Sequence, residues 1–262
     1  MTAERSLRSV FISGGASGIG LAAARRFRRE GWTVGIGDVD ASGMARAAAE
    51  LDLWTAPLDV RDRDQWRAAL AGFVAHTRGR LDLLVNNAGI CRYGLFEEVS
   101  PTESDDQVDI NVKGVINGAY AALPHLKATG GSRLVNIASC AGLVGSPGLA
   151  VYSATKFAVR GLSEALDIEF ARHGVAVACV MPWFVDTPIL DSGSSGTNKT
   201  IRDAIGNSPV YTADEAADVI WRAARGGERD YVVGKAARRL RFLSRFAPGM
   251  LRRRLKRAMA TR

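Results

Sequence analysis

Short apolar runs alternate along the chain with segments of helical periodicity. Strand-like runs occupy residues 9–13, 33–37, 53–58, 82–85, 133–138, 175–181 and 231–233. Helical patterns cover residues 21–27, 41–51, 64–78, 107–128, 151–173 and 212–225. Strands that alternate with helices predict a parallel sheet covered by helices on both faces. We therefore expect residues 1–234 to form one doubly wound α/β domain.

A glycine-rich turn follows the first apolar run. Residues 14–20 have the spacing Gly-x3-Gly-x-Gly and lead directly into a helical pattern. A strand, a glycine turn and a helix in this order can set a pyrophosphate on the N-terminus of the helix, because glycines let the backbone approach it closely. On its own, the turn is equally consistent with an ordinary tight connection.

Asp38 stands just beyond the second strand, 24 residues after Gly14. An acidic residue near this place accepts hydrogen bonds from the hydroxyls of an adenosine ribose and repels a 2′-phosphate. Neither the glycine turn nor residues 39–41 contain an arginine that could hold that phosphate. The pattern therefore favours NAD over NADP. The alternative is that Asp38 caps the next helix, although Asp40 could serve this purpose equally well.

Tyr152 and Lys156 are four residues apart in a helical pattern and so share one helix face. An ammonium beside a phenol lowers the tyrosine pKa from its usual value of about 10, which suits proton exchange. Ser139 ends the strand before this helix and could hold a substrate oxygen. The arrangement fits acid–base chemistry on an alcohol or ketone, whereas an isolated pair of this kind is more often a solvated one. Gly14, Asp38, Asn87 and Ser139 all follow strand ends, so we expect them on one rim of the sheet.

Two other segments indicate function. Asn111 lies inside the helical pattern 107–128, where asparagine is mildly unfavourable, although a surface asparagine is the simpler interpretation of that residue alone. Residues 190–208 are poor in apolar side chains and long for an ordinary connection. We interpret them as a mobile lid.

Taken together, these motifs resemble the short-chain dehydrogenase/reductase family over about residues 10–234. The resemblance rests on the residues Gly18-Ile19-Gly20, Asn86-Asn87-Ala88-Gly89, Asn111, Ser139 and Tyr152-x3-Lys156. It implies a Rossmann-like sheet of about seven parallel strands with a nicotinamide cofactor at its carboxyl edge. Homodimers or homotetramers, packed through the helices of Asn111 and Tyr152, are also implied.

The resemblance also implies roles for four catalytic residues. Tyr152 would be the general acid/base, and Lys156 would lower its pKa and bind the nicotinamide ribose. Ser139 would orient the substrate oxygen, and Asn111 would support a proton relay through a water. The expected cofactor-binding residues are Gly14, Ser17, Gly18, Ile19, Gly20, Asp38, Asp59, Val60, Asn87, Ala88, Gly89, Tyr152, Lys156, Pro182 and Thr187, with Ile137 lining the nicotinamide pocket.

The chain departs from the family at Trp183, where the family usually has a glycine after the proline. The indole adds bulk and a stacking surface beside the expected nicotinamide pocket. Together with apolar Leu143, Val144, Leu149 and Phe184, it indicates a fairly apolar substrate pocket.

Composition is that of a globular protein, with 47% hydrophobic residues. No apolar run approaches the ~20 residues of a membrane-spanning helix, and residues 1–10 lack the apolar core of a signal peptide. Cys91, Cys140 and Cys179 lie far apart, without metal-ligand spacing. We therefore expect a cytoplasmic protein with reduced thiols and no metal site.

The net charge of +8 is concentrated in the C-terminal tail, residues 235–262. The tail holds eleven of the 35 lysines and arginines and no Asp or Glu, so residues 1–234 carry a net charge of −3. Its leucines have helical spacing, with Pro248-Gly249 between two pieces. A basic amphipathic helix can lie on an anionic membrane, dock on the domain or a sister subunit, or recruit an acidic substrate. Nucleic acid is not an expected partner, because aromatic residues occur only in the first piece.

Three functions are compatible with these features. The first is a dehydrogenase that transfers a hydride between NAD(H) and a fairly apolar secondary alcohol or ketone. The second is a 3-oxoacyl-thioester reductase, for which NADPH is usual and against which Asp38 argues. The third is a non-catalytic nucleotide-binding sensor on the same fold, against which the complete set of proton-transfer residues argues.

Overall fold

Seven parallel strands form the central sheet of the computed structural model, which describes residues 8–260. Their order in the sheet is β3-β2-β1-β4-β5-β6-β7. The strands are β1 (Ser9–Ser13), β2 (Thr33–Asp38), β3 (Trp54–Pro57), β4 (Leu83–Asn86), β5 (Arg133–Ile137), β6 (Ala176–Pro182) and β7 (Asp230–Val233). The predicted doubly wound α/β fold is confirmed.

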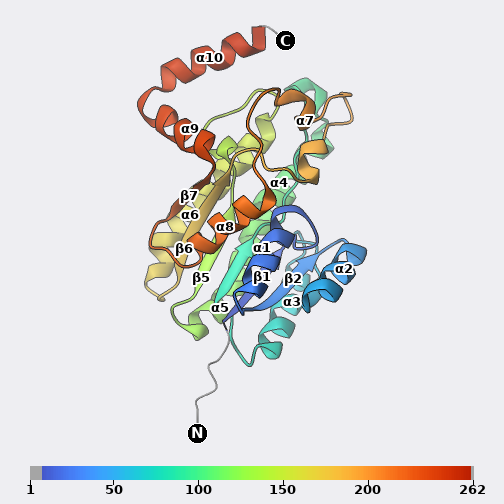
Figure 1. Cartoon of the computed structure of the whole chain (residues 1–262), viewed down its shortest axis with the longest axis vertical. Coiled ribbons are helices and arrows are strands. Elements are labelled where there is room, and N and C mark those ends of the chain that lie inside the picture. The colour runs from blue at the N-terminus through green and yellow to red at the C-terminus, as the bar shows by residue number, and fades with distance from the viewer. Residues whose placement is uncertain (1–7, 261–262) are drawn as a thin grey trace.

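Helices cover both faces of this sheet (Figure 1). One face carries α1 (Gly18–Arg29), α2 (Ala41–Leu51) and α8 (Ala213–Ala223), and the other carries α3 (Arg63–His76), α5 (Gly114–Thr129) and α6 (Ala150–Ala171). Successive residues of a strand point to opposite faces, so Val10 and Ile12 join the first core while Phe11 joins the second. Burial on both faces explains why β1 is a continuous apolar run rather than an alternating one.

The strand order reverses between β1 and β4, which pair with each other although β2 and β3 come between them in the chain. Ser13 pairs with Gly37, and Ile12 pairs with Val85, so the carboxyl ends of these strands reach the same edge. Such a reversal leaves a crevice at the carboxyl edge in which open α/β sheets bind ligands.

The single helix predicted over residues 107–128 is wrong in detail. The structure has α4 (Pro101–Val108), then a π turn, η2 (Asp109–Lys113), and then α5. Ser100 and Glu103 form a capping box that starts α4 earlier than the apolar periodicity indicated. The wider π turn contains Asn111, and such turns occur frequently at functional sites.

The predicted lid contains two short helical segments, η4 (Pro188–Asp191) and α7 (Ile201–Ala204). Hydrogen bonds tie its middle to the rest of the domain. The Ser194 hydroxyl donates to the Glu98 carbonyl at 3.0 Å, and the Ser195 amide donates to the Glu103 carboxylate at 2.9 Å. Its mobility stays a prediction.

The tail folds as two helices, α9 (Lys235–Phe246) and α10 (Pro248–Ala260), which extend from one end of the molecule (Figure 1). Ala237 of α9 is fully buried against the domain. Two short 3-10 helices complete the fold, η1 (Phe96–Glu98) and η3 (Cys140–Gly142). Within residues 8–260, we find no helix both long and apolar enough to cross a membrane.

Candidate functional site

One cavity of about 680 Å³ runs along the carboxyl edge of the sheet. Most of the predicted site residues line it, and they lie at the carboxyl ends of six strands, β1 to β6, or in the segments that follow them. They are Gly14, Ser17, Gly18, Ile19, Asp38, Asp59, Val60, Asn87, Ala88, Gly89, Ile137, Ser139, Tyr152, Lys156, Pro182 and Thr187. Two predicted residues, Gly20 and Asn111, lie behind this lining and support it.

The glycine turn brings the N-terminus of α1 to the cavity. Gly14 and Gly18 have φ angles of +66° and +53°, which a residue with a side chain adopts with strain. A Cβ on Gly20 would collide with the carbonyl oxygen of Gly14, so the helix can pack this closely only without a side chain there. Ser17 precedes the helix, and its side chain makes no capping hydrogen bond to the described first turn. The Ser17 side chain therefore does not compete for the amides at this helix N-terminus, where a pyrophosphate would fit.

The Asp38 side chain is hydrogen-bonded to the glycine turn. Its carboxylate accepts hydrogen bonds from the backbone amides of Ala16, at 2.9 Å, and Asp40, at 3.1 Å. The cap of α2 is instead Asp40, whose side chain accepts a hydrogen bond from the Gly43 amide at 2.9 Å. The alternative interpretation of Asp38 as the helix cap is therefore wrong, and its side chain is available at the cavity wall.

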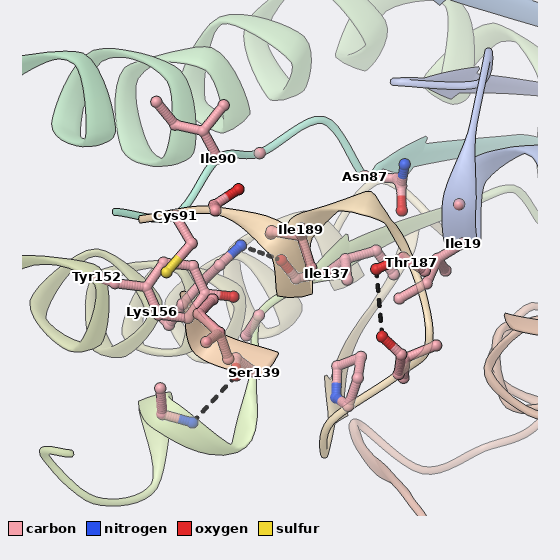
Figure 2. A pocket seen from close by; sticks show the side chains of 18 of the residues that line it. Ile19, Asn87, Ile90, Cys91, Ile137, Ser139, Tyr152, Lys156, Thr187 and Ile189 are labelled. Carbon is pink, nitrogen blue, oxygen red and sulfur yellow. Dashed lines mark hydrogen bonds between the residues drawn. The ribbon is translucent and has the colours of Figure 1, made fainter. Parts of the chain in front are cut away.

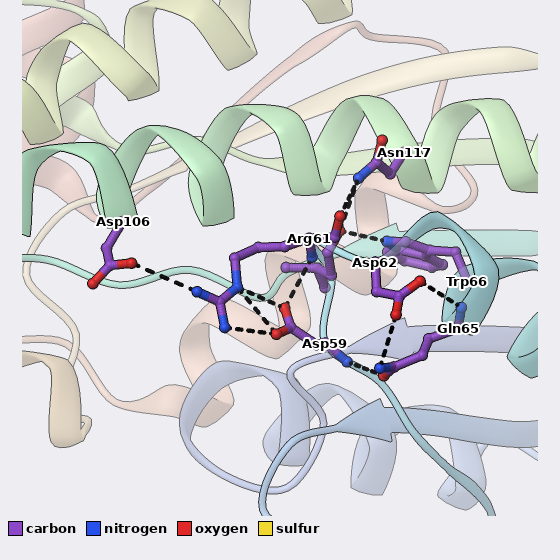
Figure 3. A network of polar contacts seen from close by, with 8 residues as sticks. Asp59, Arg61, Asp62, Gln65, Trp66, Asp106 and Asn117 are labelled. Atoms are coloured by element: carbon purple, nitrogen blue, oxygen red, sulfur yellow. Dashed lines mark hydrogen bonds and ion pairs between the residues drawn. The ribbon is translucent and has the colours of Figure 1, made fainter. Parts of the chain in front are cut away.

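Asp59 and Val60 belong to a network that also contains Arg61, which the sequence reasoning missed (Figure 3). The Arg61 guanidinium donates to Asp59 at 2.7 Å and lies 3.6 Å from the Asp106 carboxylate. This hydrogen bond is the main cause that holds the pKa of Asp59 below its usual range. The Val60 carbonyl accepts hydrogen bonds from the Trp66 indole and the Asn117 amide, both at 3.1 Å. The network orders this side of the cavity before a ligand binds.

Asn87 joins the end of β4 to the glycine turn. Its side-chain amide donates to the carbonyls of Ser13, at 3.0 Å, and Gly14, at 2.9 Å. The Ser13 hydroxyl in turn accepts from the backbone amides of Asn87 and Ala88, at 3.1 and 3.2 Å. These bonds span the reversal of strand order and fix the floor of the crevice.

Ser139, Tyr152 and Lys156 meet at the same cavity wall (Figure 2). The Lys156 ammonium lies 5.6 Å from the centroid of the Tyr152 ring and donates to the Ile137 carbonyl at 3.0 Å. The Ser139 oxygen accepts from the Ala141 amide at 3.1 Å, and the Ser139 side chain also hydrogen-bonds with the Tyr152 phenol. The tertiary structure thus brings the end of β5 and the first turns of α6 together, as the sequence predicted.

Burial dominates the titration of this pair. It raises the pKa of the Tyr152 phenol, although a hydrogen bond to Ser139 acts in the opposite direction. It lowers the pKa of the Lys156 ammonium to about 8. The net shift at Tyr152 is therefore opposite to the predicted one, because the cost of removing the phenolate from water outweighs the hydrogen bond with Ser139.

Asn111 is fully buried and connects three segments around the site. Its side-chain oxygen accepts from the Ile90 amide at 2.8 Å, and its side-chain nitrogen donates to the Ile90 carbonyl and the Thr155 hydroxyl, at 2.9 and 3.2 Å. The Thr155 hydroxyl donates to the Tyr152 carbonyl at 2.7 Å. The interpretation of Asn111 as a surface residue is wrong, and its contacts fix the first turn of α6.

The apolar part of the cavity was only partly predicted. Val144, Leu149, Trp183 and Phe184 line it, whereas Leu143 packs into a neighbouring core cluster. The sequence reasoning missed the apolar residues Ile90, Ile110, Val185, Ile189, Leu190, Ile201, Leu240, Leu251 and Leu255. For the last three, the helical spacing of leucines in the tail was the available signal, but it did not indicate which surface they face.

The cysteines are buried and free. Burial raises the pKa of each thiol to about 12, so none is a thiolate near neutral pH. Across the described residues, no three His, Cys, Asp or Glu side chains are grouped so that they could hold a metal ion.

Known proteins are similar to this chain in sequence and in architecture. A family model described as short chain dehydrogenase matches residues 8–198. The oxidoreductase UcpA of Salmonella typhimurium is 36% identical over 197 residues, which cover 73% of this chain and 74% of UcpA. The 3-oxoacyl-[acyl-carrier-protein] reductase FabG of Thermotoga maritima is 32% identical over 229 residues, 86% of this chain and 92% of FabG.

Solved structures of short-chain dehydrogenases are also similar to this chain. A short-chain dehydrogenase/reductase from Burkholderia phymatum in complex with NAD superposes with a TM-score of 0.81 at 25% identity, covering 92% of this chain and 94% of that one. ElxO with NADP bound gives a TM-score of 0.76 at 28% identity, covering 87% of this chain and 97% of the ElxO chain. The family model, the relatives and the sheet order agree, and the chain belongs to the short-chain dehydrogenase/reductase family of oxidoreductases.

Proposed function

We propose that this oxidoreductase transfers a hydride between NAD(H) and a fairly apolar secondary alcohol or ketone. One observation carries the proposal. A single cavity begins at the glycine turn and the N-terminus of α1, and it also contains Ser139, Tyr152 and Lys156. A dinucleotide site and a set of proton-transfer residues are thus continuous. A bound nicotinamide would supply or accept the hydride.

Tyr152 acts in this proposal as the general acid/base. It takes the alcohol proton in the oxidation and returns a proton to the oxygen in the reduction. The Ser139 hydroxyl donates to the same substrate oxygen, since the Ser139 oxygen already accepts from Ala141. The Lys156 ammonium lies 5.6 Å from the centroid of the Tyr152 ring, where its positive charge would favour the phenolate that forms when Tyr152 gives up its proton.

Asn111 acts as a positioning residue and supports the proton relay. Its hydrogen bonds to Ile90 and Thr155 hold the start of α6, where Tyr152 and Lys156 lie. A Cβ on Gly89 would lie 3.1 Å from the Asn111 oxygen and 3.5 Å from the Lys156 nitrogen, so Gly89 leaves these two groups close to the cavity. A relay water between them is consistent with this geometry.

The cofactor site would use Gly14, Ser17 and the amides of Gly18 and Ile19 for the pyrophosphate. Asp38 would accept hydrogen bonds from the adenosine ribose and repel a 2′-phosphate, which favours NAD. Asp59 and Val60 would lie beside the adenine, and Asn87 to Gly89 near the adenosine ribose. Lys156, Pro182 and Thr187 would surround the nicotinamide end, where the Thr187 hydroxyl donates to the Val185 carbonyl at 3.2 Å.

Tyr152→Phe tests the chemistry directly. It removes the proton-transfer group and leaves the ring, so turnover of a secondary alcohol should fall by about 10²–10⁴-fold. NADH binding, measured by calorimetry, should change little. Turnover at the wild-type rate would remove Tyr152 from its role, and loss of NADH binding would point to misfolding instead.

A 3-oxoacyl-thioester reductase using NADPH is the second candidate function, favoured by the similarity to FabG. Separate titrations with NADH and NADPH distinguish the two. A preference for NADH supports the alcohol dehydrogenase, whereas a preference for NADPH would overturn the Asp38 argument and direct the screen to 3-oxoacyl thioesters. Cofactor binding without turnover of any alcohol, ketone or thioester would favour the third candidate, a sensor.

Family members are generally oligomeric, and we extend this to a homodimer or homotetramer here. Tyr120 on α5 is 74% exposed, and Phe157 and Ile168 on α6 are 42% and 75% exposed. Exposed apolar side chains on adjacent helices are typical of an interface. We place the protein in the cytoplasm, with peripheral contact between its basic tail and an anionic membrane.

A further inference from the structure

Three leucines of the C-terminal helices line the same cavity as the proposed catalytic residues. They are Leu240 on α9 and Leu251 and Leu255 on α10. Leu251 is only 8% exposed, and Leu255 is half-buried. Helices α9 and α10 of the tail therefore contribute part of the cavity wall.

The start of α9 is packed against the turn that contains Ser139. Ala237 is fully buried in an apolar cluster that includes Ala138 and Cys140, the two chain neighbours of Ser139. Leu240 and Trp183 pack against the same cluster. The indole of Trp183 and the first turns of α9 thus pack on the same apolar cluster beside Ser139.

The backbone fixes the direction in which α9 leaves β7. Gly234 has a φ angle of +92°, and a Cβ there would collide with the ring of Tyr211. The Tyr211 hydroxyl accepts from the Ala236 amide at 3.3 Å, and the Arg241 guanidinium donates to the Asp230 carbonyl at 3.2 Å. These contacts hold α9 against the domain and so fix where α10 begins.

Polarity separates the two faces of α10. Leu251 and Leu255 are four residues apart and share one face, which lies against the cavity. Arg252, Arg253 and Lys256 are exposed on other faces. The apolar face of α10 therefore packs against the cavity, and its charged side chains are exposed to solvent.

The cavity beside this wall suits a carbon chain. The lining of the cavity also includes the apolar side chains of Val144, Leu149, Phe184, Leu190 and Ile201. The charged side chain of Arg92 also lines the cavity, but its guanidinium lies 3.8 Å from the Glu103 carboxylate.

We propose that α9 and α10 complete the substrate site, and that Leu240, Leu251 and Leu255 select alcohols and ketones carrying an extended apolar chain. The inference rests on the proposed function and names the substrate class for it. Each methylene of the substrate that packs against these leucines is transferred from water to an apolar surface. This transfer should improve kcat/KM by about fourfold for each methylene that reaches the leucines.

The experiment measures kcat/KM with NAD for 2-butanol, 2-hexanol, 2-octanol and 2-decanol. Wild-type protein should prefer the long alcohols. Leu251→Ser and Leu255→Ser should each lower kcat/KM for 2-decanol by about tenfold, because contact with apolar surface is lost. The kcat/KM of both variants for 2-butanol should stay within about twofold of the wild-type value. Leu255→Trp, which adds bulk to the wall, should shift the preference to shorter alcohols.

Leu243→Ser is the matched control, since Leu243 is a half-buried leucine of α9 outside the cavity lining. It should keep the wild-type dependence on chain length. Wild-type dependence in Leu251→Ser and Leu255→Ser, or a loss equal to that of Leu243→Ser, would overturn the proposal. If wild-type protein turns over no alkanol, the proposed function fails. Calorimetric titration of 2-decanol in the presence of NADH then tests the role of the wall. The proposal requires Leu251→Ser and Leu255→Ser to bind 2-decanol more weakly than Leu243→Ser does.

Discussion

Lys156 shows how a buried charge in the site acts on the stability of the whole protein. It is 4% exposed, and burial lowers its pKa from 10.5 to about 8. Between pH 8 and 10.5 the unfolded chain holds more protons at this residue than the folded protein does. The contribution of Lys156 to stability therefore rises with pH across this window, and below pH 8 the residue destabilises the fold.

Lys156→Met should accordingly increase the free energy of unfolding at pH 7 by roughly 1–3 kcal/mol, less than the full shift because the hydrogen bond to Ile137 is lost. The gain over wild type should shrink as the pH rises from 8 towards 10.5. Urea denaturation at pH 7 and pH 9.5 measures both effects. A variant less stable than wild type at pH 7 would contradict the argument.

Sequence reasoning identified these side chains by type and spacing, but the direction of the pKa shift at Tyr152 required the structure. Spacing places Lys156 beside Tyr152 on one helix face, which predicts a lower phenol pKa. The opposite shift comes from burial of the phenol, since Tyr152 packs against the cluster of Cys91, Tyr93, Leu190 and Ile201. That burial is a property of the packed molecule.

At the scale of elements, the junction of β1, the glycine turn and α1 depends on the absence of one side chain. A Cβ on Gly20 would meet the Gly14 carbonyl and the side-chain amide of Asn87. The helix N-terminus could then no longer approach the turn as closely as it does.

Gly20→Ala should therefore weaken NADH binding by roughly tenfold or more and cost about 1–3 kcal/mol of stability. Calorimetric titration with NADH and urea denaturation measure the two effects. Gly227→Ala is a suitable control, because an added Cβ there meets no atom of the described residues within 4 Å and its φ angle is not left-handed. Equal effects of the two substitutions would refute the steric argument.

Apolar periodicity did not predict the π turn that contains Asn111. Apolar spacing predicted one helix over residues 107–128, and the chain is helical there. The π turn at Asp109–Lys113 was not predicted, because it is stabilised by contacts of Asn111 with Ile90 and Thr155, 21 and 44 residues away in the chain. Local pattern carries no information about partners at such separations.

At the scale of the molecule, charge is distributed very unevenly. The domain is slightly acidic, while the tail carries eleven basic residues, and exposed Phe242 and Phe246 lie on α9. Such a surface is attracted to anionic lipid by about 1 kcal/mol for each basic residue near the membrane. The proposed membrane contact would use these outer faces, since the leucines face the cavity.

Replacement of Arg252, Arg253 and Arg254 by Gln should weaken binding to phosphatidylserine vesicles by about a hundredfold at low salt. Sedimentation with vesicles of increasing phosphatidylserine content measures this effect. Activity towards 2-butanol should not change, because these side chains are exposed and outside the cavity lining. Replacing Arg29, Lys127 and Arg222 on the domain is the matched control for net charge. An equal loss in both triple variants would mean that general charge, rather than the tail, drives binding.

The sequence by itself determined the order of strands and helices, the glycine turn and the family, since these depend on local periodicity and on residue types at short spacing. It also identified the side chains that the carboxyl edge brings together, because parallel strands end on one side of a sheet. Only the tertiary structure decided the burial that raises the Tyr152 pKa, the network around Arg61, and the placement of Leu240, Leu251 and Leu255 in the cavity wall. These features arise from contacts between residues far apart in the chain, and neither spacing nor composition records which distant surfaces will meet.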